Sequence, residues 1–244
     1  GKVNLGNIIF AYPGVQSYHP NPDPWFAKKE GGPVIDMGPY YLTALVNLLG
    51  PAKQVWGSLM WNNRKRIIGI GPRKGKSIKV LCPTTYLGTI FFRNKTIIRF
   101  TLSFDVIAHH RNHIELYGDK GSILVPDPNM FGGSVFTCKK LGGIWKEHKT
   151  NKMLLGKINI REKSLRANEA PINANYRGAG LAEMAYCIEN KKKHRCNGEL
   201  SLHILDIIQS IMLAARKKKR VNIKSTCLIP KRFTQKEIKK IIKY

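Results

Sequence analysis

One carboxylate, Asp36, lies inside the apolar, glycine-flanked stretch GGPVIDMGPYY at residues 31–41. Tyr40 follows four residues later, so in a helix the two side chains lie one turn apart on one face, and Thr43 and Asn47 continue that face. The other faces are apolar. Because a buried polar group without a partner is costly, we expect this polar stripe to face a cavity, a ligand or another domain.

A helix cap is the alternative explanation for Asp36. If the helix begins at Asp36, the carboxylate caps the amide of Gly38, and Pro39 occupies the first turn, where its missing N–H does no harm. If the helix begins at Pro33, Pro39 must kink it. The spacing alone favours the capping role over a catalytic one.

The residues around this stretch predict one α+β domain. Apolar residues at three- and four-residue intervals predict a helix that starts near residue 33 and ends at Gly50-Pro51, after a proline-rich segment (residues 17–26) that we expect to be an ordered loop. Residues 53–140 then show the period-two alternation of half-buried strands. The clearest predicted strands, of which the last two form a hairpin, are 86–92, 96–104, 113–118 and 122–125.

Two helices are predicted after the strands, and we expect both to lie on the sheet. The first has an apolar face of Leu181, Met184, Ala185 and Ile188. The second has one of Ile204, Leu205, Ile208, Ile211, Met212 and Ala215. Strands followed by helices, without regular alternation, favour a largely antiparallel sheet in a single domain that spans residues 1–244.

The composition bounds the partners and the compartment. The formal net charge is +27, but the lysines are spread along the chain, and the runs KKKHR and RKKKR fall at predicted helix ends. A solvated basic surface is therefore favoured over a nucleic-acid partner, and no membrane partner is expected because no long apolar run occurs. The five cysteines have no metal-ligand spacing, which predicts reduced, buried thiols in a cytoplasmic protein.

The sequence around Asp36, GGPVIDMGPYYLTALVNLLGP, resembles the active-site helix of the Gfo/Idh/MocA oxidoreductases, the family of glucose-fructose oxidoreductase and inositol dehydrogenase. Other segments resemble parts of that family's C-terminal domain in the same order, so the resemblance covers nearly the whole chain. These segments are HPNPDPWF, SFDV, HIELYGDKGSILVPDPNMFGG, NYRGAGLAEMAY and HRCNGELSLHILD.

The resemblance implies an architecture and a reaction. Family members carry an N-terminal Rossmann domain that binds NAD or NADP, followed by an α+β domain whose helices pack on one face of an open sheet. The chain then represents the substrate-binding domain of an oxidoreductase for a sugar, polyol or related hydroxyl compound, inactive alone, and a homo-oligomer through the open sheet face. The Rossmann domain is missing, because the glycine cluster at residues 69–75 has the wrong spacing and is interpreted as a surface turn.

The resemblance also assigns the catalytic candidates. The implied reaction is hydride transfer from a carbinol carbon to nicotinamide, coupled to removal of the hydroxyl proton. Family members place an aspartate at the position of Asp36 and a histidine or tyrosine at that of Tyr40. Tyrosine is a poor base at neutral pH unless a cation stabilises its phenolate, so Asp36 is expected to orient the substrate or the lysine of the missing domain.

Further residues are candidates for substrate binding, each with a structural alternative. His19 and Asn21 are placed to reach a polyol hydroxyl or to stabilise their loop. His109 and His110 are candidates for substrate contact; with His113 they also suggest a metal, but adjacent histidines on a strand point to opposite faces. Tyr176 and Arg177 match a family segment and either line the pocket or start a helix, and Asp127 is most simply a turn residue.

A second function stays open on the sequence. A stand-alone, non-catalytic binding protein for a polyanion or nucleic acid would retain the same fold and use the basic surface. The two hypotheses differ in whether the complete protein binds NAD(H) or NADP(H).

Overall fold

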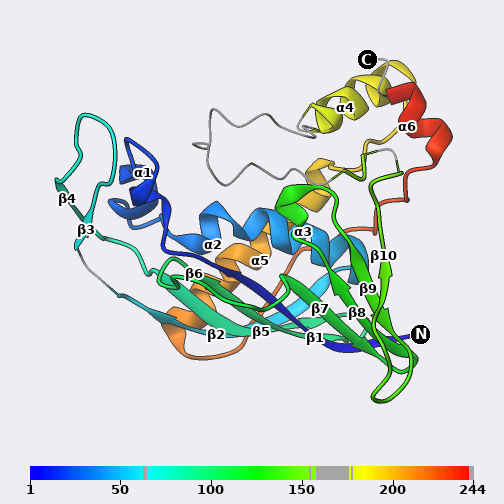
Figure 1. Ribbon diagram of the computed structural model, residues 1–244, viewed down its shortest axis with the longest axis horizontal. Coiled ribbons are helices and arrows are strands. Elements are labelled where there is room, and N and C mark those ends of the chain that lie inside the picture. The colour runs from blue at the N-terminus through cyan, green and yellow to red at the C-terminus, as the bar shows by residue number, and fades with distance from the viewer. Residues whose placement is uncertain (63–64, 154, 158–175, 177, 242–244) are drawn as a thin grey trace.

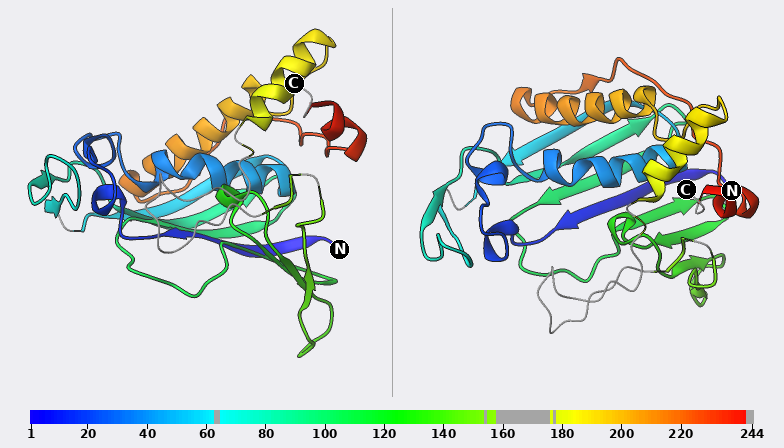
Figure 2. Two further views of the ribbon diagram at one scale, coloured as in Figure 1. Left: turned by 45° about the horizontal axis from the view of Figure 1, so that its top comes forward. Right: turned by 90° about the horizontal axis from the view of Figure 1, so that it is seen from above.

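Helices α3 (Gly38–Leu49) and α5 (Gly198–Lys217) lie on one face of a nine-stranded sheet in the computed structural model, which describes residues 1–62, 65–153, 155–157, 176 and 178–241 (Figures 1 and 2). The strand order is β10-β9-β8-β7-β1-β6-β5-β2-β11. Only β1 and β6 pair in parallel among these neighbours. The predicted α+β class, with an open, largely antiparallel sheet and helices on one face, is confirmed.

The strands agree well with the predicted segments. The parallel pair continues by one hydrogen bond beyond β1, from the N–H of Tyr12 to the carbonyl oxygen of Ser103. A separate two-stranded sheet, β3 (Lys65–Ile67) with β4 (Ser77–Lys79), stands beside it. The nine strands of the main sheet are β1 (Val3–Ala11), β2 (Ala52–Met60), β5 (Thr85–Phe92), β6 (Ile97–Ser103), β7 (Ile114–Gly118), β8 (Gly121–Val125), β9 (Val135–Cys138), β10 (Lys146–His148) and β11 (Val221–Asn222).

The proline-rich segment contains two short helical turns where we expected only loop. They are η1 (Val15–Ser17) and α1 (Asp23–Phe26), and Pro24 fits inside the first turn of α1, where its missing N–H costs nothing. The remaining helical elements are α2 (Pro33–Asp36), η2 (Pro128–Met130), α4 (Ala179–Glu189) and α6 (Gln235–Ile241).

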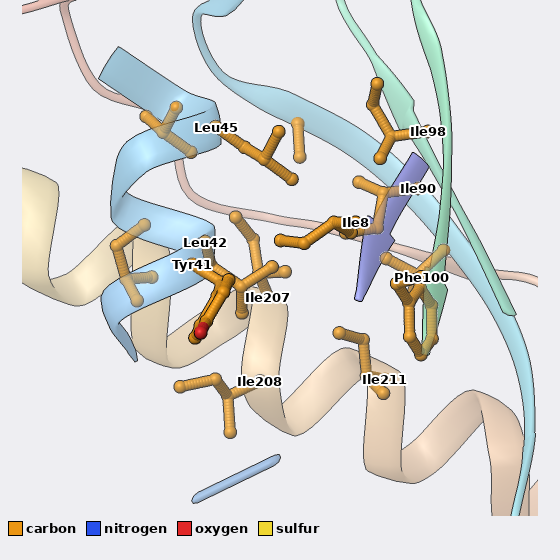
Figure 3. Close-up of a cluster of buried hydrophobic side chains, with 14 of the residues drawn as sticks. Ile8, Tyr41, Leu42, Leu45, Ile90, Ile98, Phe100, Ile207, Ile208 and Ile211 are labelled. Carbon is orange, nitrogen blue, oxygen red and sulfur yellow. The ribbon is translucent and has the colours of Figure 1, made fainter. Parts of the chain in front are cut away.

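The main core fills the space between α3, α5 and the sheet. Leu42 and Leu45 from α3 meet Ile207 and Ile211 from α5 above the strands (Figure 3). The ring of Phe100 occupies room left by two paired glycines, because a Cβ at Gly88 would lie 2.7 Å from its Cζ atom and 2.2 Å from the Trp56 carbonyl oxygen. The ring of Phe100 therefore fits over the sheet because the two paired positions beneath it are glycines, which have no side chains.

Helix α4 does not lie on the sheet, so that prediction was wrong. Its predicted apolar face is outward: Leu181 is 70% exposed and Ile188 is 68% exposed. Instead α4 packs against α6, away from the sheet (Figures 1 and 2). The reason is the buried carboxylate of Glu183, which pairs with Arg195 at 2.9 Å and turns the other face inward. The face predicted for α5 is buried except at Met212, which is half-buried, and at Leu205, which is exposed.

Two predictions from composition have mixed outcomes. Cys82, Cys187 and Cys227 are buried free thiols, whereas Cys138 is half-buried and Cys196 is exposed. By length and composition α5 would be able to cross a membrane, but half of its apolar stretch is buried in this domain, which is typical of a core helix.

A buried histidine joins α5 to the edge of the sheet. Nε2 of His203 accepts the N–H of Ala52 at 3.0 Å, so Nδ1, 2.9 Å from the Ser225 hydroxyl, carries the proton in the neutral ring. Ser225 in turn donates to Asp206 at 2.7 Å. Burial lowers the pKa of His203, and the Asp206 charge opposes this only in part.

This histidine predicts a pH dependence of stability. Below the ordinary histidine pKa of about 6.5 the unfolded chain takes up a proton that the folded chain resists. The stabilisation is therefore complete above that pH and is lost as the pH falls towards the lowered pKa of the folded state. We expect His203→Gln to show a flatter change in the free energy of unfolding between about pH 5 and 7 in urea titrations. Equal slopes for the two proteins would contradict this role.

Candidate active site

Asp36 is the last residue of α2. Its half-buried carboxylate lies at the end of the sheet where strands β1 and β6 terminate. Burial raises its pKa, and a hydrogen bond from the indole of Trp25 acts in the opposite direction. Tyr12 lies close enough for the Asp36 charge to raise the pKa of its phenol further, after burial and Tyr18. The carboxylate thus lies among aromatic rings and is only partly solvated.

The capping role of Asp36 is not observed. Helix α3 begins after Met37, which makes no side-chain cap, and Pro39 lies in its first turn. The helical segment instead begins at Pro33 and is interrupted before Pro39, which matches the second of the two geometries predicted from the sequence. The Asp36 carboxylate therefore stays available for another role.

Tyr40 lies in the first turn of α3 and is 44% exposed. Since Asp36 and Tyr40 belong to two consecutive helices, the break at Met37 replaces the regular one-turn spacing assumed from the sequence. One residue of the pair is half-buried and the other is open to solvent, so a ligand can reach Tyr40 from outside the domain.

The loop before α2 brings one predicted substrate residue to Asp36 and holds the other elsewhere. The ring of His19 packs against Trp25, with 4.8 Å between ring centroids, so His19 reaches the surroundings of Asp36 through that indole. The side chain of Asn21 accepts from Arg73 at 3.3 Å, and its N–H donates to His19 Nδ1 at 3.2 Å. Asn21 and His19 thus stabilise their loop, and a substrate contact by either residue stays a prediction.

A buried ion pair supports this loop. Arg66, beyond β2, pairs through Nη2 with Asp105 at 2.5 Å, and both side chains are almost fully buried. The same guanidinium donates to the carbonyl of Pro13 at 2.6 Å and to that of Phe104 at 3.0 Å. The other Asp105 oxygen accepts from Thr84 and Thr85, each at 2.7 Å. The ion pair therefore joins three connections at one end of the sheet: the one after β1, the one between β2 and β5, and the one after β6.

A second apolar cluster lies under the loop and separates it from the main core. The Arg66 guanidinium lies 4.7 Å from the centroid of Phe26, and Phe26 meets Phe104 edge-on. The cluster consists of Val15, Phe26, Ile68, Ile78, Val80, Cys82 and Phe104. The loop that carries His19 and Trp25 is therefore ordered by packing as well as by charge.

Of the three histidines after β6, His109 lies against His113 and His110 is open to solvent, and the metal alternative gains no support. His109 is half-buried, with its ring centroid 5.8 Å from that of His113, whereas His110 is exposed. No group of three or more histidine, cysteine or acidic residues among the described positions is arranged to hold a metal ion. His109 meets His113, and no contact of either His109 or His110 with Asp36 is observed in the described part of the chain.

Asp127 has a larger role than a turn residue. It closes η2 by accepting the N–H of Asn129, as expected, and it also accepts the hydroxyl of buried Tyr41 at 2.8 Å. Phe131, after η2, packs against Tyr176 with 5.4 Å between ring centroids. Tyr176 is therefore placed near α3 through η2, which packs on that helix. Arg177 lies outside the described residues.

Sequence reasoning missed Trp25, Arg66 and Asp105 as parts of this site. Asp105 stands in SFDV, a segment used only to support the family resemblance, and Arg66 was not singled out. A single aspartate directly after the most regular predicted strand was the available signal, because a charge at a strand end must find a partner if the end is buried.

Two other features lie away from Asp36 and Tyr40. The glycine cluster forms the turn of the β3–β4 hairpin, as predicted; the N–H of Gly75 donates to Ile68 and that of Lys74 to Gly71, and the N–H of Gly69 donates to Gln16. A hollow of about 750 Å³ lies between α4 and α6; Tyr176 lines it, whereas Asp36 and Tyr40 do not.

Solved structures share this fold. An oxidoreductase from Agrobacterium radiobacter, in complex with NAD+, L-tartaric acid and magnesium, aligns with 91% of this chain and 57% of its own at 13% identity (TM-score 0.62). The aldose-aldose oxidoreductase of Caulobacter crescentus, complexed with glycerol, aligns with 91% and 56% at 18% identity (TM-score 0.61). Gal80p of Saccharomyces cerevisiae, a super-repressor mutant, aligns with 91% and 58% at 11% identity (TM-score 0.64).

The family follows from a sequence model. The model of the GFO/IDH/MocA C-terminal domain matches residues 1–124, half of the chain, and this chain belongs to that family. No curated protein matches the chain. The chain spans somewhat more than half of each solved neighbour, and at these identities the neighbours establish the fold alone.

The buried ion pair predicts a selective loss of stability. Asp105→Asn leaves the Arg66 charge uncompensated, and breaking a buried pair in this way costs about 3–5 kcal/mol. We expect a loss of that size in the free energy of unfolding, measured in urea. The matched control is Asp23→Asn, which breaks the exposed pair with Arg73 and should change stability little. Similar losses in both variants would show that Arg66 is not desolvated in the native state.

Proposed function

We propose that this chain is the substrate-binding and oligomerisation domain of an NAD(P)-dependent oxidoreductase that acts on a sugar, polyol or related hydroxyl compound. The observation that carries the proposal is a half-buried Asp36 that caps no helix among the described residues, followed four residues later by an exposed Tyr40 in the first turn of α3, in a chain of this family. A partly desolvated carboxylate and a solvent-accessible phenol suit the orientation of a substrate hydroxyl and removal of its proton.

The dinucleotide itself does not fit the described residues of this chain. Their glycine cluster is a hairpin turn in which the amides of Gly69, Lys74 and Gly75 already donate to backbone carbonyls and are not free to bind a pyrophosphate. NAD or NADP is therefore assigned to a separate domain, where it supplies the hydride acceptor when bound. The residues of this chain bind the hydroxyl compound, orient it through Asp36 and place Tyr40 to take the proton.

A polyhydroxy substrate matches the groups around Asp36. Carboxylate, imidazole and phenol side chains of Asp36, His19 and Tyr40 supply hydrogen-bond donors and acceptors beside the flat apolar ring of Trp25, a combination suited to the polar edge and apolar face of a sugar. His109, His110, Tyr176 and Arg177 stay candidates for further contacts. The neighbours with tartaric acid and glycerol bound are consistent with a small hydroxyl compound.

The catalytic assignment is tested in a protein that also carries an NAD(P)-binding domain. We expect such a protein to reduce NAD+ or NADP+ with a member of a panel of glycerol, tartrate, glucose and myo-inositol, followed at 340 nm. Asp36→Asn and Tyr40→Phe should each lower kcat about 100-fold or more, because each removes a group that binds or moves the proton.

The control is Asp119→Asn, a carboxylate in the turn between β7 and β8. It should leave kcat unchanged. If the protein binds neither NAD(H) nor NADP(H), the enzyme proposal fails.

Self-association through the uncovered sheet face belongs to the same proposal. Strand register aligns Trp56, Thr89, Arg99, Asn7 and Glu115 in one row across that face. Arg99 donates to Asn7 at 2.8 Å, and Asn7 donates to Glu115 at 2.9 Å. Burial raises the pKa of Glu115, but hydrogen bonds from Tyr117 and Asn7 outweigh it and the net pKa is lowered. The row is ordered and charged without a covering layer of helices.

The apolar residues beside this row give the test. Trp56 is 45% exposed and Leu87 is 44% exposed, and a second copy would cover both. We expect Leu87→Glu to shift the chain towards monomer in light-scattering chromatography, because it buries a charge at the interface. Leu181→Glu, at an exposed leucine of α4, is the matched control and should not change the mass. An unchanged mass in both variants would contradict the assignment of this face.

A non-catalytic binding protein is the second candidate. The net charge of +27 favours an anionic partner, and a repressor is among the solved neighbours. This candidate requires binding to nucleic acid that persists at about 0.2 M salt, where a merely basic surface loses most of its affinity. A cytoplasmic location is part of both proposals.

A further inference from the structure

Tyr41 and Asp127 join the candidate catalytic turn to a segment 86 residues away in the chain. Tyr41 follows Tyr40 and is fully buried, as Figure 3 shows among the core residues, and its hydroxyl donates to Asp127 Oδ1 at 2.8 Å. The same oxygen accepts the N–H of Asn129 at 2.9 Å and so closes the first turn of η2. One carboxylate therefore fixes two backbone segments at once.

His113 completes this cluster from the sheet. Its Nδ1 atom lies 3.4 Å from the Tyr41 hydroxyl and 3.1 Å from the carbonyl oxygen of Ile9, near the end of β1. Its Nε2 atom lies 3.6 Å from Asp127 Oδ2. Asp127 is thus in reach of a group on α3 and of a group on the residue before β7.

The first turn of α3 needs such a tertiary bond. Its N-cap, Met37, makes no side-chain hydrogen bond, and Pro39 has no N–H to offer. On the other side of η2, Phe131 packs against Tyr176, and we call these two rings the aromatic wall. Asp127 lies between the turn that carries Tyr40 and the aromatic wall.

We propose that Asp127 is a positioning residue that acts through Tyr41 and holds the Tyr40-bearing turn of α3 in place against the aromatic wall of the substrate site. The role of the wall in substrate binding rests on the proposed function, whereas the bond between Tyr41 and Asp127 does not. Burial, followed by the charge of Asp127, raises the pKa of the Tyr41 phenol, which keeps it a donor at neutral pH.

Hydrogen exchange of the full chain tests the positioning directly. Tyr41→Phe removes the donor, and Asp127→Ser removes the acceptor while a hydroxyl still closes the turn of η2. We expect the amides within residues 38–42, of which Pro39 has none, to exchange about tenfold faster in each variant. This is the effect of one lost buried hydrogen bond. The double variant should be no faster than either single one, since both remove the same bond.

Two variants serve as controls. Tyr86→Phe removes a hydroxyl that is equally buried but has no hydrogen-bond partner among the described residues, so it should leave amides 38–42 unchanged. Asp127→Asn keeps an oxygen at the Oδ1 position and should restore most of the wild-type protection. Exchange of amides 38–42 in Tyr41→Phe at the rate of Tyr86→Phe would overturn the proposal.

Ligand affinity separates positioning from general stability. With glycerol and with tartrate as probes in NMR titrations well below the unfolding temperature, we expect Tyr41→Phe and Asp127→Ser to bind about tenfold more weakly and Asp127→Asn to bind nearly as wild type. Faster exchange with unchanged affinity would overturn the link to the substrate site. A wild-type chain that binds neither probe would contradict the proposed function, and the exchange rates would still decide the role of Asp127.

Discussion

The buried ion pair between Arg66 and Asp105 is the interaction on which the candidate site depends. Removing two charges from water costs several kcal/mol, and the cost is recovered only where further hydrogen bonds satisfy both groups. Here carbonyl and hydroxyl groups of Pro13, Phe104 and Thr84 supply such bonds, although Nε of Arg66 has no partner among the described residues. The arrangement therefore gives less to stability than to position: it fixes where the connections from three strands meet.

Strand order explains why those connections meet. The strand register pairs Ala11 with Ser103, Ser103 with Thr85, and Thr85 with Met60. Strands β1, β2 and β6 therefore end, and β5 begins, at the same end of the sheet. The parallel pairing of β1 with β6 is essential, since it sends two outgoing loops from neighbouring strands in the same direction. Three segments leave the sheet at this end: the loop with His19 and Trp25, the segment with Arg66, and the segment with Asp105. Asp36 lies beside them.

Much of this fold could be predicted from local patterns, and the rest could not for a physical reason. The strand with Ile98, Phe100 and Leu102 was predictable because its inner face is buried and its outer face is wet, which is the condition that alternation reports. Helix α4 failed because Glu183, a residue that an apolar pattern places outside, is buried by pairing with Arg195. A periodic pattern records which residues are apolar but not which charges are neutralised in the fold.

The candidate site shows the same limit more sharply. The family pattern identified Asp36 and Tyr40, but Asp127 was interpreted as a turn residue and Asp105 was given no role of its own until their partners, 86 and 39 residues away, were seen. Each such bond joins segments whose sequence separation carries no periodicity, so only the folded chain reveals it.

The state of Asp36 follows from these supports. Since burial raises its pKa while the Trp25 indole opposes the rise, the carboxylate is held away from bulk water with one donor already in place. A group in that condition gains more from a hydroxyl or a cation brought to it than a solvated carboxylate does, because less water must be displaced. The packed loop that carries His19 and Trp25 therefore matters to Asp36 as well as to the fold: it keeps the carboxylate partly desolvated and supplies the Trp25 donor.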